Sequence, residues 1–419
     1  MIEEKKKILV IADSPLAPSG VGTQTKYMIE AMLKTGEYKF LCLAGAIKHR
    51  DYRTQKVDPW GDDWLIKPTD GYGDPNTIRA ILRDYRPDIL WFMTDPRFYS
   101  WLWEIEDEVR SCIPMVYYHV WDNYPYPDFN KSFYDSNDVV CTISKVTDDI
   151  VRTVSPEVEC VHLPHTVNTD IFRKSTPEAI KKTRDLITNG TDKKIFFWNN
   201  RNARRKQSGT LIFWFKEFLD KVGHNNACLV MHTEPDDPHG QDLEAIIKNL
   251  DLANGQVILS TVKLPPEELA KIYSSSDCTI NISDAEGFGL GTLESLACET
   301  PILVNMTGGL QEQVTDGENW FGIGLNPCSK AVIGSQDVPY IYEDRLNKEQ
   351  FIDAMKEIFE KTPEELKALG QAGREHVLNN YGFEQYSERW KKVFDSVTKN
   401  YGSWDNRKKH KRWEFKEIK

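Results

Sequence analysis

Residues 284–322 read DAEGFGLGTLESLACETPILVNMTGGLQEQVTDGENWFG, and this stretch indicates the fold class most clearly. It starts where the apolar run 278–282 ends, passes through glycines into a helix of small residues, and then enters a strand led by a proline. Strand, glycine turn, helix and strand in this order are typical of a parallel α/β sheet. Ligands of such sheets collect outside the carboxyl ends of the strands, where these glycines are expected to lie.

The alternation of strand and helix runs along the chain in two successive series. Apolar runs without strict alternation, separated by helices, indicate parallel strands that are buried on both faces. The first series predicts strands at 7–12, 89–93, 115–119, 139–143 and 160–163, and helices at 23–33, 76–84 and 102–110. The second predicts strands at 195–198, 228–232, 257–259, 278–282 and 302–304, and helices at 210–221, 242–250, 266–273 and 291–298. We therefore expect an α/β protein with two doubly wound, Rossmann-like domains.

The limits of the two domains follow from the segments around the series. The polar stretch 173–192 is the expected linker, so the first domain covers 1–175 and the second 176–383. From residue 347 onward the chain is expected to be helical to its end. The irregular segment 326–344 matches neither the strand pattern nor the helix pattern and has no predicted structure.

Composition excludes several classes of protein. A chain of 419 residues is long enough for two domains, and 40% hydrophobic residues are enough for two cores. The net charge of −11 argues against a protein whose whole surface binds nucleic acid. The eight cysteines form no C-x-x-C pair, which favours free thiols in a reducing cytosol over a zinc site or a disulfide framework. With no signal-peptide core and no run of about 18 apolar residues, we expect a cytoplasmic protein.

Two glutamates in the opening stretch, Glu286 and Glu294, have seven residues between them. Glu286 follows the end of a strand, and the glycines after it let the backbone come close to a charged ligand. The next helix is expected to begin near Gly291, so that its unpaired N–H groups face an anion such as a diphosphate. Glu294 would then lie in the first turn, close to the same ligand. Two solvated glutamates beside a buried helix are the alternative.

This arrangement resembles the Glu-x7-Glu signature of the retaining glycosyltransferases of family 4, also named glycosyl transferases group 1, which have the GT-B fold. The resemblance extends to Gly308-Gly309 with Glu312, and to Asp316-Gly317. It implies two Rossmann-like domains that face each other across a cleft. It also implies that Glu286 contacts the hydroxyls of the donor sugar and that Glu294 holds those of the ribose. The donor-binding segment would also include Gly287, Phe288, Gly289 and Leu290.

A basic loop after the first strand of the second series provides another match. The sequence Trp198-Asn-Asn-Arg201-Asn-Ala-Arg-Arg-Lys206 places an Arg after a strand and a Lys five residues later, as the family does. The resemblance implies that Arg201 and Lys206 neutralise the donor diphosphate. Two cations can stabilise a leaving diphosphate without a metal, because negative charge grows there in the transition state. Arg204 and Arg205 compete for the role, and a solvated basic loop is the alternative.

The first series carries further matches. Its first loop, Pro18-Ser-Gly20-Val-Gly22, resembles the Gly-rich loop that the family places beside the diphosphate and the acceptor. Tyr117-Tyr118-His119-Val-Trp-Asp122 resembles the strand-end His motif, which implies that His119 approaches the anomeric carbon and the phosphates. A packed or capped residue is the alternative for His119. Residues 164–172 resemble the strand exit at the domain junction and are assigned a hinge role. Residues 381–390 resemble the final helix, which would cover about 384–419 and pack back on the first domain.

These features predict transfer of a sugar from a nucleoside diphosphate sugar, UDP rather than GDP, to an acceptor hydroxyl. Retention at the anomeric carbon is implied by the resemblance. Catalysis is assigned to His119, Glu286, Arg201 and Lys206. No metal and no separate cofactor is expected, because no Asp-x-Asp lies at a strand end. A nucleotide-sugar epimerase and a non-catalytic nucleotide-sugar-binding module are the alternatives.

The acceptor is open at this stage. A saccharide or a lipid-linked glycan is the main expectation, and a modified base in viral DNA is the alternative. The C-terminal run Arg407-Lys-Lys-His-Lys-Arg412, with Trp404, Trp413 and Phe415 around it, could contact an anionic membrane surface or nucleic acid, or could be a solvated tail. Several aromatic residues of the first domain could stack on a sugar or a base, although core packing accounts for most of them: Trp91, Trp101, Trp103, Trp121, Tyr124 and Tyr126.

Overall fold

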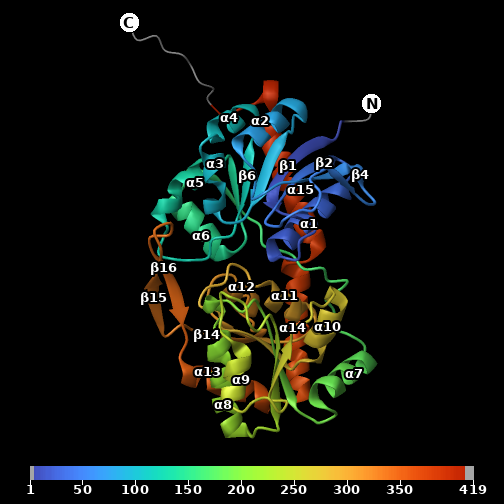
Figure 1. Ribbon diagram of the computed structural model, residues 1–419, viewed down its shortest axis with the longest axis vertical. Coiled ribbons are helices and arrows are strands. Elements are labelled where there is room, and N and C mark those ends of the chain that lie inside the picture. Colours follow the sequence, from blue (N-terminus) through green and yellow to red (C-terminus); the bar gives the residue numbers. More distant parts are fainter. Residues whose placement is uncertain (1–3, 411–419) are drawn as a thin grey trace. The chain divides into compact units, whose positions relative to one another are not determined.

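The computed structural model describes residues 4–410, which form two compact units (Figure 1). One unit contains the residues up to Thr166 together with those from Phe383 onward, and the other runs from Val167 to Gly382. The chain therefore leaves the first unit, builds the second and returns to the first. Residues 167–175, which the sequence pattern grouped with the first domain, belong to the second unit.

The first unit is built around an eight-stranded sheet in the order β3-β4-β2-β1-β5-β6-β7-β8. Neighbouring strands are parallel except β3 and β4, which pair antiparallel. The order of the strands reverses between β1 and β5, so the switch point of this sheet lies outside their carboxyl ends. The strands are β1 (Lys6–Asp13), β2 (Tyr38–Gly45), β3 (Gln55–Val57), β4 (Gly61–Pro68), β5 (Ile89–Met93), β6 (Met115–His119), β7 (Val139–Thr142) and β8 (Glu159–His162).

The helices of the first unit begin at residues that favour a helix start. Ser19 caps the first helix by accepting a hydrogen bond from the Gly22 N–H at 3.0 Å. Asp74 caps the second helix, and Pro75 follows it at the first helical position, where no N–H is needed. The helices are α1 (Gly20–Leu33), α2 (Pro75–Asp84), α3 (Ser100–Trp103), α4 (Glu106–Cys112), α5 (Lys131–Asp135), α6 (Lys145–Val154) and α15 (Phe383–Tyr401), with short 3-10 turns η1 (Pro96–Tyr99), η2 (Asp128–Asn130) and η4 (Trp404–Asn406).

Helix α15, drawn in red in Figure 1, ties the end of the chain to the first unit. Its Trp390 is fully buried, and the indole packs against Trp91 of β5 and Tyr118 of β6 with ring centroids 5.8 and 5.0 Å apart. The final helix thus belongs to the first unit. The expected extent of about 384–419 is wrong, because the helix ends at Tyr401, where Gly402 adopts a positive φ of 58°.

The described residues after α15, 402–410, pack on the first unit. The indole N–H of Trp404 donates to the Pro87 carbonyl at 2.9 Å. The Arg407 side chain is 1% exposed, and its Nη2 pairs with Asp138 Oδ1 at 2.7 Å. The described part of the basic run is therefore partly structural. The remainder of the run, with Trp413 and Phe415, lies outside the described residues.

The second unit is built around a six-stranded, fully parallel sheet in the order β11-β10-β9-β12-β13-β14. Its order reverses between β9 and β12, which places the switch point outside the carboxyl ends of those two strands. The strands are β9 (Lys194–Asn199), β10 (Ala227–His232), β11 (Val257–Ser260), β12 (Cys278–Asn281), β13 (Ile302–Asn305) and β14 (Gly322–Leu325). The helices are α7 (Pro177–Thr188), α8 (Ser208–Val222), α9 (Leu243–Asn249), α10 (Pro266–Ser275), α11 (Leu290–Ala297), α12 (Leu310–Val314), α13 (Lys348–Glu360) and α14 (Pro363–Asn380), with a 3-10 turn η3 (Arg204–Lys206).

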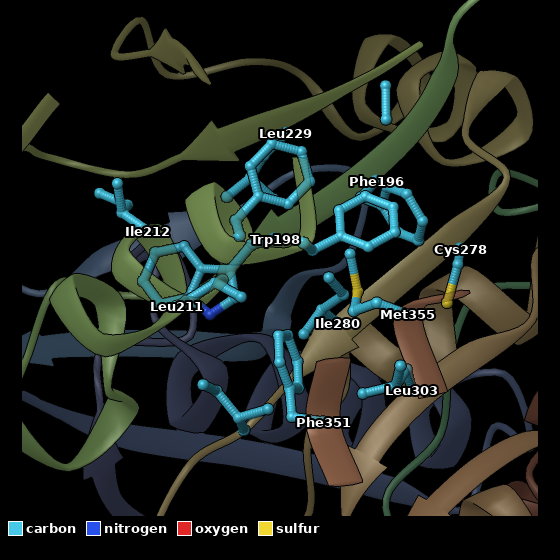
Figure 2. Packing of buried hydrophobic residues seen from close by; sticks show 14 of the residues in the cluster. Phe196, Trp198, Leu211, Ile212, Leu229, Cys278, Ile280, Leu303, Phe351 and Met355 are labelled. Carbon is cyan, nitrogen blue, oxygen red and sulfur yellow. The ribbon is translucent and has the colours of Figure 1, made fainter. Parts of the chain in front are cut away.

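One large hydrophobic cluster of the second unit covers one face of this sheet. Figure 2 shows Phe196 and Trp198 of β9 among side chains from α8 and from Phe351 and Met355 of α13, and the labelled residues are almost fully buried. Burying a side chain of this size contributes roughly 1.5–3 kcal/mol relative to exposure. This packing fixes β9, and with it the position at which the basic loop begins.

The structure departs from the expected elements in several places, and it adds the strands β2, β3, β4 and β14, which the sequence pattern did not predict. The stretch 173–192 is not a linker, because α7 fills most of it and Arg184 pairs with Asp277 at 3.1 Å. The expected helix 102–110 is interrupted between α3 and α4. The segment 326–344, without a predicted structure, forms a hairpin of β15 (Ser329–Ile333) and β16 (Ile341–Arg345).

We predict that Arg407→Met destabilises the protein, because it removes the nearer of the two arginines that pair with the buried Asp138 carboxylate, the other being Arg110 at 3.4 Å. Breaking a buried pair in this way costs about 3 kcal/mol. Urea unfolding measures the loss, and Lys408→Met, at an exposed neighbouring position, is the matched control. Equal stability of the two variants would contradict a structural role for Arg407.

Candidate functional site

Two loops leave the carboxyl ends of β9 and β12, where the strand order of the second unit reverses. The loop after β9 carries Arg201 to Lys206, and the loop after β12 carries Glu286. The structure brings the two loops together, because the Lys206 ammonium donates a hydrogen bond to Glu286 Oε2. Two candidate residues that are 80 positions apart in the sequence thus meet at the edge of the sheet where ligands of this fold bind.

The Glu286 carboxylate is buried and is held by three side chains. Besides Lys206, Asn281 donates from Nδ2 at 3.3 Å and Ser283 from Oγ at 3.4 Å, both to Oε2. Burial alone would raise the pKa of Glu286, but the charges of Lys206 and Arg205 outweigh it and lower that pKa to about 2. Glu286 is therefore a carboxylate at neutral pH and can only accept hydrogen bonds.

The turn that follows Glu286 requires glycine at one position. Gly289 has a φ of 92°, and a Cβ there would lie 2.5 Å from Leu310 Cδ2 and 2.8 Å from Thr292 Oγ1. The Gln313 amide braces the turn by donating to the Phe288 carbonyl at 2.7 Å. Phe288 itself is 3% exposed and packs against Tyr381, so its side chain is part of the core. The turn leads directly into α11 at Leu290, whose first N–H groups follow the glycine.

Glu294 is the fifth residue of α11, one position later than the expected first turn. The Tyr273 hydroxyl donates to Glu294 Oε2 at 2.9 Å, and Asn199 Nδ2 donates to the same hydroxyl at 2.8 Å. Burial raises the pKa of Glu294 to about 7, and the hydrogen bond from Tyr273 only partly opposes that rise. Glu294 therefore changes charge near neutral pH.

The four cations of the basic loop have different partners. Arg201 is 61% exposed and pairs with Asp237 at 2.6 Å, at the surface. Arg204 pairs with Glu343, Arg205 donates to the carbonyl of Ala285, and Lys206 pairs with Glu286. Lys206 is thus the loop cation that contacts a candidate donor residue, whereas Arg201 would have to exchange Asp237 for a ligand. These contacts therefore distinguish the roles of the four loop cations, which their spacing in the sequence could not do.

Several residues that hold the site residues in place were not predicted from the sequence. Asn281 and Ser283 are polar residues at the end of an otherwise apolar strand, and this position is a signal that could have identified them. Tyr273 and Gln313 lie on other helices, and their contacts with the site are not visible in the local sequence pattern. They hold Glu294 and the glycine turn in place.

The glycine loop of the first unit surrounds a buried carboxylate at the end of β1. Asp13 accepts hydrogen bonds from Ser19 Oγ at 2.6 Å and from the Tyr72 hydroxyl at 2.8 Å. Gly20 is the first residue of α1. A Cβ on Gly22 would lie 2.7 Å from the carbonyl oxygens of Ser14 and Ala17, so the loop closes tightly around this position.

His119 ends β6 of the first unit and is fully buried. Its Nε2 lies 2.9 Å from the Tyr134 hydroxyl, and its ring packs 4.9 Å from that of Tyr117. Burial lowers the pKa of His119 to about 3, so the imidazole is neutral at pH 7. His119 and the glycine loop belong to the first unit, whereas Glu286, Glu294 and the basic loop belong to the second.

Residues 4–410 contain no cluster of three or more His, Cys, Asp or Glu side chains arranged to hold a metal ion. None of the helices found there has the length and apolar character needed to cross a bilayer. All eight cysteines are free thiols, and six of them are buried.

Two Rossmann-like units, the second with a charged site at its switch point, define a protein of the GT-B class. Sucrose-phosphate synthase from Thermosynechococcus elongatus shares this fold with a TM-score of 0.74 at 16% identity, over 94% of this chain and 100% of that chain. HepE from Anabaena, solved with UDP-glucose, superposes with a TM-score of 0.69 at 13% identity, over 93% of this chain and 99% of that chain.

Residues 180–376 match the model of the family described as glycosyl transferases group 1, so this part of the chain is similar to that family. D-inositol 3-phosphate glycosyltransferase from Corynebacterium jeikeium is 27% identical over 158 residues, 38% of each chain. The GDP-mannose-dependent alpha-(1-6)-phosphatidylinositol monomannoside mannosyltransferase of Mycolicibacterium smegmatis is 26% identical over 252 residues, 58% of each chain. The chain thus spans less than two thirds of the length of these relatives.

We predict that Gly289→Ala costs more stability than Gly317→Ala. Both glycines have a positive φ, so both variants bear the strain of a left-handed alanine, about 1–2 kcal/mol. Only at Gly289 does the added Cβ also meet close atoms, whereas nothing lies within 4 Å at Gly317. Such overpacking adds about 1–3 kcal/mol. Urea unfolding of the two variants compares the costs, and equal losses would contradict the tight turn.

Proposed function

We propose that this chain is a retaining glycosyltransferase that moves a sugar from a nucleoside diphosphate sugar to an acceptor hydroxyl. The observation that supports the proposal most strongly is the Lys206–Glu286 pair at the switch point of the second unit, close to the start of α11. A cation, a buried carboxylate and a helix N-terminus at one edge of a parallel sheet suit a ligand with both phosphates and hydroxyls.

Each part of the donor is assigned to a group of this site. The ribose hydroxyls donate to the Glu294 carboxylate, and the sugar hydroxyls donate to Glu286. The diphosphate lies against Lys206, Arg201 and the N–H groups of residues 289–291. Arg201 is preferred to Arg204 because Arg201 pairs with Asp237 only at the surface, whereas Arg204 is held by the almost fully buried Glu343.

The proposed reaction breaks the bond between the anomeric carbon and the diphosphate oxygen and forms a bond from the acceptor oxygen to the same face of that carbon. The acceptor proton passes to the departing phosphate. Lys206 and Arg201 stabilise the negative charge that grows on this phosphate, which is the work that a metal ion does elsewhere. His119 is proposed to contact the donor as a neutral imidazole, in agreement with its pKa of about 3.

We propose a UDP-sugar as the donor. The likeness to HepE, which was solved with UDP-glucose, supports this choice at the level of the fold. One of the relatives is described as GDP-mannose-dependent, so GDP-mannose is the donor to compare with UDP-glucose. UDP-glucose and GDP-mannose are therefore the two probes for the experiments below.

The acceptor is proposed to be a saccharide or a lipid-linked glycan that binds the first unit in the cytoplasm. Large apolar side chains are exposed in loops that follow the carboxyl ends of its strands, and Phe98, 52% exposed, stacks on Tyr72 at 5.2 Å. Aromatic rings of this kind pack well against sugars. The other exposed large apolar side chains of these loops are Leu16, Ile47, Tyr52 and Tyr126. A modified base in DNA has weaker support, because Arg407 of the basic run is buried against Asp138.

We predict that UDP-glucose binding strengthens as the pH rises towards 7. The donor needs the Glu294 carboxylate, and the raised pKa keeps this group protonated below about pH 7. Affinity should therefore change about tenfold for each pH unit below that pKa and level off above it. UDP-glucose carries no phosphate monoester, so its own charge stays constant. Calorimetry from pH 5 to 8 measures the slope, and Glu294→Gln should remove it; a variant with the wild-type slope excludes Glu294 as the titrating group.

We predict that Lys206→Met and Arg201→Met each lower the rate of sugar transfer by about 10²-fold or more, because both cations stabilise growing charge. Release of nucleoside diphosphate from UDP-glucose or GDP-mannose measures the rate. Sugar transfer should continue when EDTA removes divalent metal ions. Arg204→Met should lower the rate of transfer less than Arg201→Met does. The opposite order would show that the register assigned to the basic loop is wrong, and loss of turnover in EDTA, restored by Mg²⁺, would contradict the proposed charge stabilisation.

A further inference from the structure

The hairpin β15–β16 is attached to the candidate site although it is not part of the six-stranded sheet. Its two strands pair antiparallel with each other, from Ser329 with Arg345 to Ile333 with Ile341. In Figure 1 it is the orange pair of strands labelled β15 and β16. Val332 of β15 is 68% exposed, so the hairpin adds little to the core. The last residues of β16, Glu343 to Arg345, contact the candidate site.

Two residues of β16 that lie two positions apart, Glu343 and Arg345, form ion pairs with the two loops of the site. Glu343 is 2% exposed and accepts hydrogen bonds from Arg204 Nη1 and from Arg345 Nη2, each at 2.9 Å. Arg345 also pairs with Asp284, which is 4% exposed. The backbone adds a further contact, because the Asp344 N–H donates to the Asp284 carbonyl at 2.8 Å.

These contacts lie beside the pair that the proposed function uses. Arg204 is two residues before Lys206, and Asp284 is two residues before Glu286. The two loops also bind each other here, since the Asp284 N–H donates to the Arg205 carbonyl at 2.8 Å and Gln207 Nε2 donates to Asp284 Oδ2 at 2.5 Å. Strand β16 therefore holds both loops at positions that set the approach of Lys206 to Glu286.

The charges of this network balance. Glu343 and Asp284 supply two buried carboxylates, and Arg204 and Arg345 supply two guanidinium groups. Burial alone would raise the pKa of Glu343, but hydrogen bonds from Arg204 and Arg345 outweigh it and lower that pKa, so the carboxylate stays charged. Removing one member leaves an uncompensated charge next to the basic loop, and the loop must shift to relieve it.

We infer that the β15–β16 hairpin is a positioning clamp for the donor site, which acts through Glu343 and Arg345 to fix Lys206 opposite Glu286 and to hold Arg204 away from the diphosphate. The inference rests on the proposed glycosyl transfer and adds positioning residues that its motifs do not contain. A displacement of about 1 Å in a charge-stabilising group can cost as much as 10²-fold in rate while the ligand still binds. The clamp should therefore affect turnover much more than donor binding.

A different role for Arg204 predicts the opposite result. If Arg204 itself bound the diphosphate, Glu343 would compete with the donor, and Glu343→Gln would raise donor affinity or activity by releasing Arg204. In the clamp, the same change lowers turnover because the loop loses its anchor. The sign of the Glu343→Gln effect thus separates the two roles.

The experiment compares wild-type protein, Glu343→Gln, Arg204→Met and the double variant. Release of nucleoside diphosphate is measured with UDP-glucose, or with GDP-mannose if the wild-type protein hydrolyses it faster, and donor affinity by calorimetry. Each single variant should lower kcat about tenfold with less than a threefold change in donor Kd. The double variant should be no slower than the slower single variant, because the two residues act through one contact.

Arg184→Met is the matched control, since Arg184 forms an ion pair with Asp277 of the same unit next to the opposite ends of the strands. It should lose thermal stability but keep the wild-type kcat at temperatures well below unfolding. Unchanged or raised kcat in Glu343→Gln overturns the clamp, and so do losses that multiply in the double variant. A wild-type protein that releases nucleoside diphosphate from neither donor contradicts the proposed function itself.

Discussion

The ion pair between Lys206 and Glu286 is the contact on which the site in the second unit depends. It joins the loops after β9 and β12, the two strands between which the sheet reverses its order. A buried carboxylate is costly unless it is paired and hydrogen-bonded, and Glu286 satisfies this requirement with Lys206, Asn281 and Ser283. The core packing of β9, the glycine turn and the network of β16 all fix the geometry of this pair.

The two glutamates of the site differ in charge because their surroundings differ. Glu286 lies beside cations, and its pKa is about 2, whereas Glu294 is buried with a hydrogen bond from the neutral Tyr273 hydroxyl, and its pKa is about 7. One carboxylate is thus permanently charged, and the other responds to pH near neutrality. Two residues of the same type in one motif therefore differ in charge, which suits the separate roles proposed for them at the sugar and at the nucleoside.

Much of this structure could be predicted from the sequence. The strands at 89–93 and 115–119 have the predicted limits, because apolar runs bounded by polar residues fix buried parallel strands. The polar stretch 173–192 misled the prediction, because a helix that exposes most of one face, such as α7, has the composition of a linker. The hairpin 329–345 could not be predicted, since its contacts with Arg204 and Asp284 join segments more than 50 residues apart. Likewise, spacing could not tell which loop cation meets Glu286.

The central claim is that the switch point of the second unit binds a nucleotide sugar. Hydrogen–deuterium exchange with and without UDP-glucose or GDP-mannose tests it most directly, because it reports where the donor protects backbone N–H groups without requiring a known acceptor. The predicted result is protection concentrated in residues 199–207 and 284–294, and its loss in Glu294→Ala. Unchanged exchange in both segments with either donor, or protection that persists in Glu294→Ala, would contradict the assignment.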